Sequence, residues 1–378
     1  MKAVTCTTES LYERLLMMLK NETNITEFLQ LNTFSREGTN NIYTMGRTFF
    51  AYFTPIIIII GIVGNLLSLH VFLSQNLRSL SASRYLAALS VSDLITIIFY
   101  VSVEWIRRGL TYLFPTTNVK ILDIEGLCQF QLYISYASRF VSAWLVVSFT
   151  IERYVSICHP LVRRNICTNR STRKVISGVI LVSCTTVLYK PALSGIYKGA
   201  TGTLYCTSLP HYGLLSFSCD SIYAVFITFV PFVVITILNV LIIRNLLKQR
   251  KNEICRQIVT KVSVIRLEFT VIHLALSICF ILLNIPYFIL WFRNFLLSKY
   301  LFNSVVSSSV INLKYWQGML YFVRTIFYMN YCINVLLYLT LGAYFRHEVR
   351  VLLTLARFRR KSFVFPITVQ TDSNQTRL

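Results

Sequence analysis

Acidic residues are scarce in this chain of 378 residues, and charged residues of both signs are few. Asp and Glu number only 15, and charged residues make up 14% of the sequence, against roughly 25% in ordinary soluble domains. So little charge cannot cover the surface of a soluble protein of this size, which excludes a soluble enzyme. The apolar content of 55% excludes intrinsic disorder as well.

Motifs of other function classes are also missing. The sequence has no nucleotide-binding loop and no His-Glu-x-x-His motif, and its five His residues are scattered over different segments, so we expect no enzyme. No internal repeat is present, which argues against a transporter. The first residues have no apolar signal-peptide core, so the first membrane helix is expected to direct insertion.

The sequence does contain long apolar stretches and an excess of basic residues. The net charge is +22 and the mean hydropathy is +0.59. In a chain this apolar, the excess predicts basic residues on one side of a membrane rather than binding to nucleic acid. Seven windows are long enough to cross the bilayer as helices, so we expect an all-α, seven-transmembrane helix bundle. These windows are Phe49–Leu73, Tyr85–Val103, Phe130–Ile151, Val175–Leu193, Ile222–Ile243, Phe269–Phe292 and Met319–Gly342.

The distribution of Lys and Arg predicts the orientation. The segments expected on the same side of the membrane as the C-terminus hold 21 Lys and Arg residues (2, 5, 7 and 7). The segments expected on the side of the N-terminus hold 13 (5, 3, 2 and 3). Basic residues favour the cytoplasmic side, so we expect an extracellular N-terminus at the plasma membrane. Glycosylation sequons at Asn21 and Asn24 agree with this orientation.

Two of the ten cysteines, Cys128 and Cys206, fall on the expected outer side, where disulfides persist. A bond between them would pin the loop after the fourth helix over the bundle. Cys6 and Cys219 also lie outside, and a second bond between them stays open. Residues 197–209 alternate in polarity around a Gly-rich centre, which predicts a β-hairpin.

Several motifs occur in register along residues 49–356. They are Gly64-Asn65, Leu89 to Asp93-Leu94, Glu152-Arg153-Tyr154 placed 25 residues after Cys128, Pro231, Phe280 with Pro286, and Asn330, Asn334 and Tyr338. With these motifs the chain resembles a rhodopsin-like (class A) G-protein-coupled receptor, and is most similar to invertebrate FMRFamide-like neuropeptide receptors. Apolar residues at helical spacing after Gly342 predict a short amphipathic eighth helix on the inner leaflet.

The resemblance implies roles for these residues. Asp93 would hold a sodium ion with Ser142, Asn330 and Asn334, or else stay protonated and hydrogen-bonded to Asn334. In the switch set, Glu152 would hold Arg153 at rest beside Tyr154, and Pro286 would kink the sixth helix. Asn334 and Tyr338 complete that set.

The sequence departs from the family at other switch positions. Asn284 replaces the usual Trp before Pro286, Val335 replaces the seventh-helix Pro, and Asn239 replaces a fifth-helix Tyr. Arg266 stands where relatives often place an acid that faces the third-helix Arg. We therefore expect a divergent receptor, with raised basal activity as a hypothesis.

The expected ligand site lies in the outer half of the bundle. Ser135 stands where amine receptors carry an Asp, which argues against a biogenic amine. Glu104, three α-helical turns above Asp93, faces this half together with Arg139 and Arg324, and the surplus of Arg suits a carboxylate or amide oxygens. A pairing of either carboxylate with an arginine is the alternative. The ligand is expected to be a small neuropeptide, with a lipid or chemosensory ligand as the alternative. The full set of expected ligand contacts is Glu104, Gln131, Ser135, Arg139, Asn284 and Arg324.

The chain thus divides into an extracellular glycosylated segment (1–48), a receptor domain (49–356) and a cytoplasmic tail (357–378). The resemblance implies a heterotrimeric G protein and arrestin as partners, besides membrane lipids. The end of the tail, Thr376-Arg377-Leu378, fits a PDZ-domain ligand.

Overall fold

The computed structural model describes residues 25–116, 123–198, 204–253, 261–301 and 309–362, and most of them are helical. Its helices are α2 (Ile25–Phe72), α3 (Ser81–Thr96), η1 (Ile97–Val101), α4 (Ser102–Trp105), η2 (Ile106–Leu110), α5 (Thr111–Leu113), α6 (Leu127–Cys158), α7 (Pro160–Ile166), α8 (Asn169–Thr186), α9 (Tyr189–Leu193), η4 (Pro210–Tyr212), α10 (Gly213–Ala224), η5 (Val225–Phe229), α11 (Val230–Glu253), α12 (Lys261–Leu301), α13 (Ser309–Tyr328), η6 (Met329–Tyr331), α14 (Ile333–Leu341) and α15 (Ala343–Ser362).

The expected all-α membrane architecture is confirmed. Within the described residues, six helices are long and apolar enough to span a membrane, and a seventh span results if Lys314–Tyr331 and Ile333–Leu341 are counted together. The observed helices extend beyond the predicted windows. The first one begins at Ile25 rather than at residue 49, because helical backbone continues past the apolar run that a hydropathy window detects.

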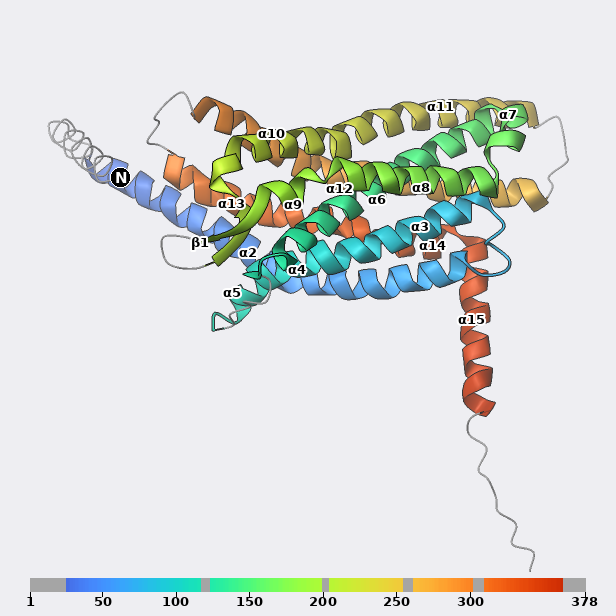
Figure 1. The fold of residues 1–378 in the computed structure, drawn as a ribbon, viewed down its shortest axis with the longest axis horizontal. Helices are drawn as coiled ribbons and strands as arrows, with labels where there is room; N and C mark the ends of the chain where they lie inside the picture. Colours follow the sequence, from blue (N-terminus) through green and yellow to red (C-terminus); the bar gives the residue numbers. More distant parts are fainter. Residues whose placement is uncertain (1–24, 117–122, 199–203, 254–260, 302–308, 363–378) are drawn as a thin grey trace, which may run out of the picture. The chain divides into compact units, whose positions relative to one another are not determined.

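The Cα positions group into two compact units. The first unit comprises Met1–Pro55, Trp105–Asn118 and Pro286–Phe327, and the second comprises Ile56–Glu104, Val119–Ile285 and Tyr328–Leu378. In the second unit α6 lies against α3, α8 and α11 (Figure 1). Its core contains Leu86, Leu145 and Phe149, with Tyr338 from α14 packed among them.

The second helix of the bundle is interrupted by two π-helical segments, η1 and η2. A π-helical turn holds one extra residue, which rotates everything beyond it by roughly 100° relative to an α-helix. Because η1 lies between Asp93 and Glu104, the predicted placement of Glu104 three α-helical turns above Asp93 on the same face is wrong. Ile97–Val101 contains no Pro or Gly, so the interruption could not be predicted from the residues at that place.

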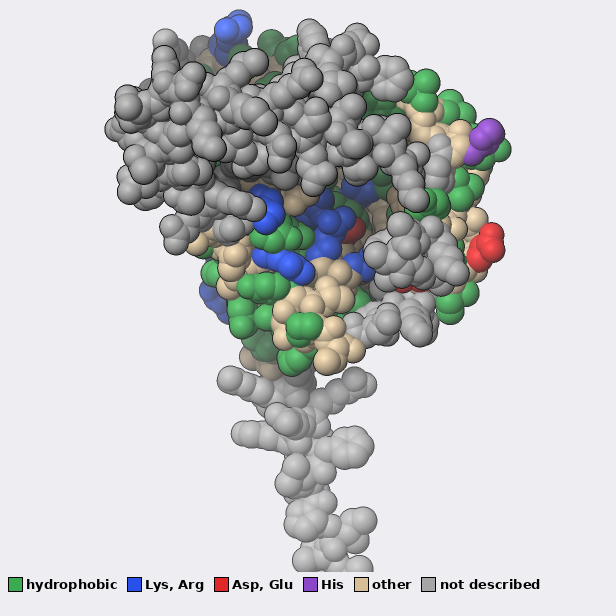
Figure 2. All heavy atoms as spheres, turned by 90° about the vertical axis from the view of Figure 1, so that its left-hand side faces the viewer, with side chains coloured by type: hydrophobic (Ala, Val, Ile, Leu, Met, Phe, Trp, Pro, Cys, Tyr) green, Lys and Arg blue, Asp and Glu red, His purple; other side chains and the backbone are tan. Residues whose placement is uncertain are grey.

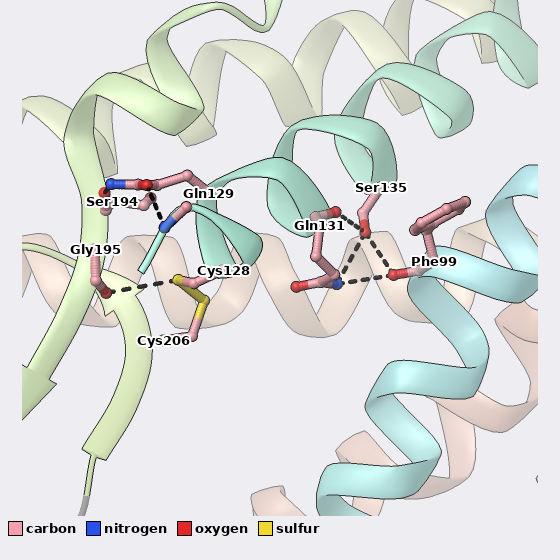
Figure 3. The surroundings of a disulfide bond; sticks show 9 residues. Phe99, Cys128, Gln129, Gln131, Ser135, Ser194, Gly195 and Cys206 are labelled. Atoms are coloured by element: carbon pink, nitrogen blue, oxygen red, sulfur yellow. Dashed lines mark hydrogen bonds between the residues drawn. A yellow bond between two sulfur atoms is a disulfide. The ribbon is translucent and has the colours of Figure 1, made fainter. Parts of the chain in front are cut away.

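Strands β1 (Ser194–Lys198) and β2 (Leu204–Ser208) form the predicted β-hairpin, with Ile196 opposite Cys206. Cys206 is bonded to Cys128 at the start of α6, with a Cα–Cα distance of 5.7 Å. The Gln129 side chain also donates a hydrogen bond to the Ser194 carbonyl at 3.3 Å (Figure 3). The hairpin is therefore attached to α6 by a covalent bond and a polar contact.

At the other end of the second unit, α15 turns away from the direction of the long helices (Figure 1). It is the expected eighth helix. Its first turn is bound by Glu268 of α12, whose Oε1 accepts a hydrogen bond from the Tyr344 amide at 2.9 Å. A carboxylate at a helix N-terminus satisfies a free amide and complements the helix dipole.

In the first unit, α2 and α13 approach closely at two glycines. A Cβ added to Gly46 would lie 2.3 Å from the Gly318 carbonyl oxygen, so no larger residue fits there. Phe49 packs on Phe322 with ring centroids 5.2 Å apart. The indole of Trp105 donates to the Ala51 carbonyl at 2.8 Å, which joins the segment from 105 to this packing.

Candidate functional site

Arg139 of α6 is surrounded by tyrosine rings in the second unit. Its guanidinium carbon lies 4.1 Å from the ring centroid of Tyr100, 4.5 Å from that of Tyr136 and 5.7 Å from that of Tyr223. Its Nε donates to the Ser135 carbonyl at 3.0 Å. Among the described residues no carboxylate contacts it, so the positive charge is stabilised by aromatic faces and one backbone carbonyl.

A buried ion pair stands beside this arginine. The Lys190 ammonium, whose side chain is only 4% exposed, lies 2.7 Å from Oδ2 of Asp220. Tyr189 donates to the other carboxylate oxygen at 2.9 Å. Lys190 Nζ also lies 4.5 Å from the centroid of Tyr136, which is the ring that Arg139 contacts. The cluster therefore holds two cations and one carboxylate.

The side chains of Gln131 and Ser135 donate hydrogen bonds to the interrupted second helix (Figure 3). The Phe99 carbonyl lies within η1, and it accepts a hydrogen bond from Gln131 Nε2 at 2.8 Å and one from the Ser135 hydroxyl at 2.7 Å. Ser135 is 1% exposed. These two side chains thus satisfy a backbone group that the π-helical turn presents, and a ligand contact by either remains a prediction.

Asp93 is buried in the same unit, at 1% exposure. Ser142 donates to its Oδ1 at 2.7 Å, and Asn334 Nδ2 lies 2.7 Å from its Oδ2. Arg139, the arginine of this unit that was the alternative partner for Asp93, lies on tyrosine rings instead. The structure thus brings three of the four predicted sodium ligands together.

Arg153 lies against its neighbour Glu152 near the end of α6. Its Nε donates to Glu152 Oε2 at 2.6 Å, and its guanidinium carbon stands 5.3 Å from the centroid of Phe149. Ser81 donates to the other Glu152 oxygen at 2.6 Å. Both charged side chains are 5% exposed, so a carboxylate fixed by α3 holds the arginine inside the bundle.

Comparison with known proteins decides the family. The family model described as the seven-transmembrane receptor (rhodopsin family) matches residues 64–338. The chain belongs to this family. It is a multi-pass membrane receptor, and not an enzyme.

Individual relatives are more distant. A probable G-protein-coupled receptor of Caenorhabditis elegans is 30% identical over 164 residues, 42% of this chain and 36% of the relative. Cysteinyl leukotriene receptor 2 of Homo sapiens is 25% identical over 173 residues, 45% and 47% of the two chains. Neuromedin-U receptor 1 of Homo sapiens is 28% identical over 141 residues, 37% and 32%. The receptor spans about a third to a half of the length of these relatives.

The remaining predicted ligand residues are divided between the two units. Asn284 is buried, and its amide donates to the Phe280 carbonyl on its own helix at 2.6 Å. Glu104 belongs to the second unit and Arg324 to the first. Pro286 lies inside α12, and Tyr154 contacts His159 with ring centroids 5.4 Å apart.

The positions at which the receptor departs from its family have acquired other contacts. Asn239 donates to Ser277 of α12 at 2.8 Å. A Cβ on Gly64 would lie 2.4 Å from Cγ1 of Val335, so this valine packs directly against the glycine. Asn65 donates to the Tyr331 carbonyl at 2.7 Å, which satisfies the backbone where the last helix is broken.

Sequence reasoning missed the aromatic and ionic surroundings of Arg139. Neither Lys190 nor Asp220 is among the predicted site residues. A membrane-helix charge signals function, so Asp220 at the start of the fifth span was a usable signal. Several other predictions lie outside the described residues or side chains: Asn21, Asn24, Cys6, the side chain of Arg266, and the end of the tail.

Proposed function

We propose that this receptor responds to a small extracellular peptide carrying a carboxylate or several amide oxygens. The observation that carries this proposal is the guanidinium of Arg139, held on three tyrosine rings with no carboxylate contacting it among the described residues. A planar guanidinium binds a carboxylate through two parallel hydrogen bonds. An incoming carboxylate therefore supplies the partner that the fold withholds.

The neighbouring ion pair supports the same ligand class. Lys190 and Asp220 cancel one another in charge, so the cluster retains one net positive charge from Arg139. The similarity to neuromedin-U receptor 1, a peptide receptor by its name, agrees with a peptide ligand. Similarity to a cysteinyl leukotriene receptor favours a lipid mediator as the second candidate, and a chemosensory ligand remains a further alternative.

The test is a screen of a peptide library on cells, read by calcium and cyclic AMP, with each hit made as a free acid and as an amide. For the wild type we expect the free acid to be more potent by about tenfold to a hundredfold, the range for a hydrogen bond to a charged group. In Arg139→Gln the two forms should become equally potent.

The exposed residue Arg173, at the other end of the bundle, gives a matched control. Arg173→Gln should keep the wild-type preference, and surface labelling should show equal amounts of all variants. A free-acid preference that survives in Arg139→Gln contradicts the proposal. Hits confined to a lipid panel would support the second candidate instead.

Signalling is proposed to proceed through Arg153. We infer that an agonist shifts α12 at Pro286, frees Arg153 from Glu152 and admits a heterotrimeric G protein, as is general in the family. The buried pair of Arg153 and Glu152 supports this role. Arg153→Ala should abolish second-messenger responses while leaving agonist binding intact.

Asp93 and Ser142 offer oxygen atoms that fit an allosteric sodium ion. Asn334 presents its amide nitrogen to Asp93, so its oxygen would ligate the ion only after the amide turns over. Asn330 is the remaining proposed ligand. Agonist affinity that falls with sodium in the wild type, and not in Asp93→Asn, would support this site.

The proposal also includes an extracellular N-terminus at the plasma membrane, glycosylated at Asn21 and Asn24. Arrestin and a PDZ domain are proposed to bind the cytoplasmic tail, the latter through Thr376-Arg377-Leu378. An epitope tag at the N-terminus should be accessible to antibody on intact cells. Access only after permeabilisation would refute the orientation and everything that depends on it.

A further inference from the structure

The π-helical turn η1 differs from an α-helix in the pairing of its backbone groups. The amide of Ser102 donates to the carbonyl of Ile97, five residues back, whereas an α-helix would pair it with Ile98. Such turns are rare in proteins and are found frequently at functional sites. We therefore expect an interaction around η1 that favours the π-helical form.

The Phe99 carbonyl, in the middle of η1, is bound by two buried side chains of α6 (Figure 3). Gln131 donates to this carbonyl at 2.8 Å and Ser135 donates at 2.7 Å. Gln131 Nε2 also lies 3.1 Å from Ser135 Oγ, so the two side chains act together. A carbonyl oxygen has two lone pairs, and these donors compete for them with the Val103 amide, the partner in an α-helix. The two side chains therefore favour the π-helical form.

The residues before η1 are fixed against α6. The hydroxyl of Ser92 in α3 donates to the Ser138 carbonyl of α6 at 2.8 Å. The Asp93 carboxylate accepts a hydrogen bond from Ser142 of α6 at 2.7 Å. A change of η1 from the π-helical to the α-helical form would therefore turn the residues after it, by roughly 100°.

Ser135 also connects η1 to Arg139. The Ser135 carbonyl accepts a hydrogen bond from Arg139 Nε at 3.0 Å, while its hydroxyl holds the Phe99 carbonyl. Tyr100, the next residue of η1, has its ring centroid 4.1 Å from the guanidinium carbon of Arg139, the shortest of the three tyrosine distances. The form of η1 therefore determines where this ring lies relative to the arginine.

We propose that Gln131 and Ser135 are positioning residues, which hold η1 in its π-helical form and thereby place the ring of Tyr100 on Arg139. Because Arg139 is the proposed ligand contact, this inference rests on the proposed function. A guanidinium held on a ring is oriented before the ligand arrives, so less entropy is lost on binding. Without the two donors, η1 should return to the α-helical form.

That return would exchange the surroundings of the residues after η1. Each of them would take the place of the residue that follows it, because the turn would hold one residue fewer. Val103, which is 8% exposed, would take the half-buried place of Glu104, and the half-buried Ser102 would take the buried place of Val103. A thiol at position 103 should then become more reactive, and a thiol at position 102 less reactive.

The experiment labels the full-length receptor in phosphatidylcholine nanodiscs with N-ethylmaleimide and measures the labelling rate by peptide mass spectrometry. The reagent is uncharged, because Lys and Arg side chains are present on the face shown in Figure 2 and would attract or repel a charged one. Ser102→Cys and Val103→Cys are made separately, each with and without the pair Gln131→Leu and Ser135→Ala.

With the native Gln131 and Ser135, the thiol at position 102 should react faster than the thiol at position 103. The pair Gln131→Leu with Ser135→Ala should shift the ratio of the two rates towards position 103 by about tenfold or more, the effect of two ordinary hydrogen bonds. Either substitution alone should shift the ratio less, in the same direction.

A deletion separates this role from a general loosening of the bundle. Ile98 is 49% exposed, so its removal costs little packing and takes the extra residue out of the turn. An α-helical form then places the later residues as the wild type does. In this background, Gln131→Leu with Ser135→Ala should leave the two labelling rates unchanged.

The matched control is Ser138→Ala, the same change as Ser135→Ala at another buried serine of α6. The Ser138 hydroxyl donates to a carbonyl of its own helix, so the labelling rates should match the wild type. Arg139→Gln should match it too, because both donors to η1 remain. The inference is overturned by rates that stay constant when both donors are removed, or that shift equally when Ile98 is deleted.

Peptide potency distinguishes positioning from direct contact. Free-acid hits of the peptide screen should lose potency on Gln131→Leu with Ser135→Ala, and should regain it when Ile98 is deleted as well. A potency loss that the deletion does not restore, together with unchanged labelling rates, would assign Gln131 and Ser135 to direct contact with the peptide and overturn the inference.

The two proposals fail in different ways. If the labelling rates shift as expected but the free-acid preference does not depend on Arg139, the proposed ligand contact is wrong and the control of η1 by Gln131 and Ser135 stands. If the preference depends on Arg139 and the rates do not shift, the reverse holds.

Discussion

The ion pair between Lys190 and Asp220 gives the sharpest energetic prediction. Its charged atoms lie 2.7 Å apart, with the side chains 4% and 30% exposed. At an effective dielectric constant of about 20, two unit charges at this distance attract by roughly 6 kcal/mol. Removing Lys190 from water offsets several kcal/mol of that attraction. We therefore expect a net coupling of about 2–4 kcal/mol between the two residues.

Single substitutions should differ in their cost. Asp220→Asn leaves a buried ammonium without its carboxylate, which should lower the free energy of unfolding by about 3–5 kcal/mol. Lys190→Met leaves a carboxylate that is partly exposed and still accepts from Tyr189, so about 1–3 kcal/mol is expected. The double variant should lose less than the sum of the two, because no unpaired charge remains.

The measurement is an SDS titration of the receptor in mixed micelles, with maleimide labelling of Cys332 as the readout. This thiol is free and buried in the folded receptor, so it reacts only on unfolding. Lys174→Met, on an exposed site, should change the unfolding free energy by less than about 0.5 kcal/mol. Losses of the two single variants that add to within about 0.5 kcal/mol in the double variant would refute the coupling.

Three further predictions concern single residues. His273 is fully buried, and neither of its ring nitrogens hydrogen-bonds to a described residue, so His273→Leu should raise the free energy of unfolding by about 1–2 kcal/mol in the same SDS titration; a loss would contradict this. Arg266→Glu should supply a second resting partner for Arg153 and lower ligand-free second-messenger levels; an unchanged, measurable baseline counts against the hypothesis. Burial, with the Glu152 carboxylate nearby, raises the pKa of the Cys167 thiol to about 11, so its thiolate is scarce at neutral pH. Its labelling by N-ethylmaleimide, followed by peptide mass spectrometry, should rise about tenfold per pH unit between about pH 8 and about pH 10, and a plateau there would disprove the shift.

Much of the fold could be predicted because its signals are local. Apolar runs of bilayer length must form helices. The alternation of polarity around the Gly-rich segment predicts the hairpin by itself, without the disulfide between Cys128 and Cys206. Asp93 could be singled out because a carboxylate in a membrane helix needs partners. Ser142 and Asn334, placed by the family resemblance, do bind it.

The surroundings of Arg139 could not be predicted, because they arise from packing between distant segments. Tyr100, Tyr136 and Tyr223 come from η1, α6 and α10, and tyrosines in membrane helices are too common to single out these three. Tyr and Trp are also enriched at both membrane interfaces for reasons of depth in the bilayer alone, so an aromatic residue there does not mark a site. Which ring faces which charge depends on helix rotation, and η1 changes that rotation.

The π-helical turn η1 also affects how knowledge of relatives may be transferred to this receptor. Beyond Val101, its second helix is one residue out of step with any relative whose helix is α-helical throughout, and η2 adds a second such offset. A mutagenesis map carried across by position alone would therefore assign the wrong neighbours to Ser102–Leu113. Equivalent residues in this stretch have to be matched by superposed backbones.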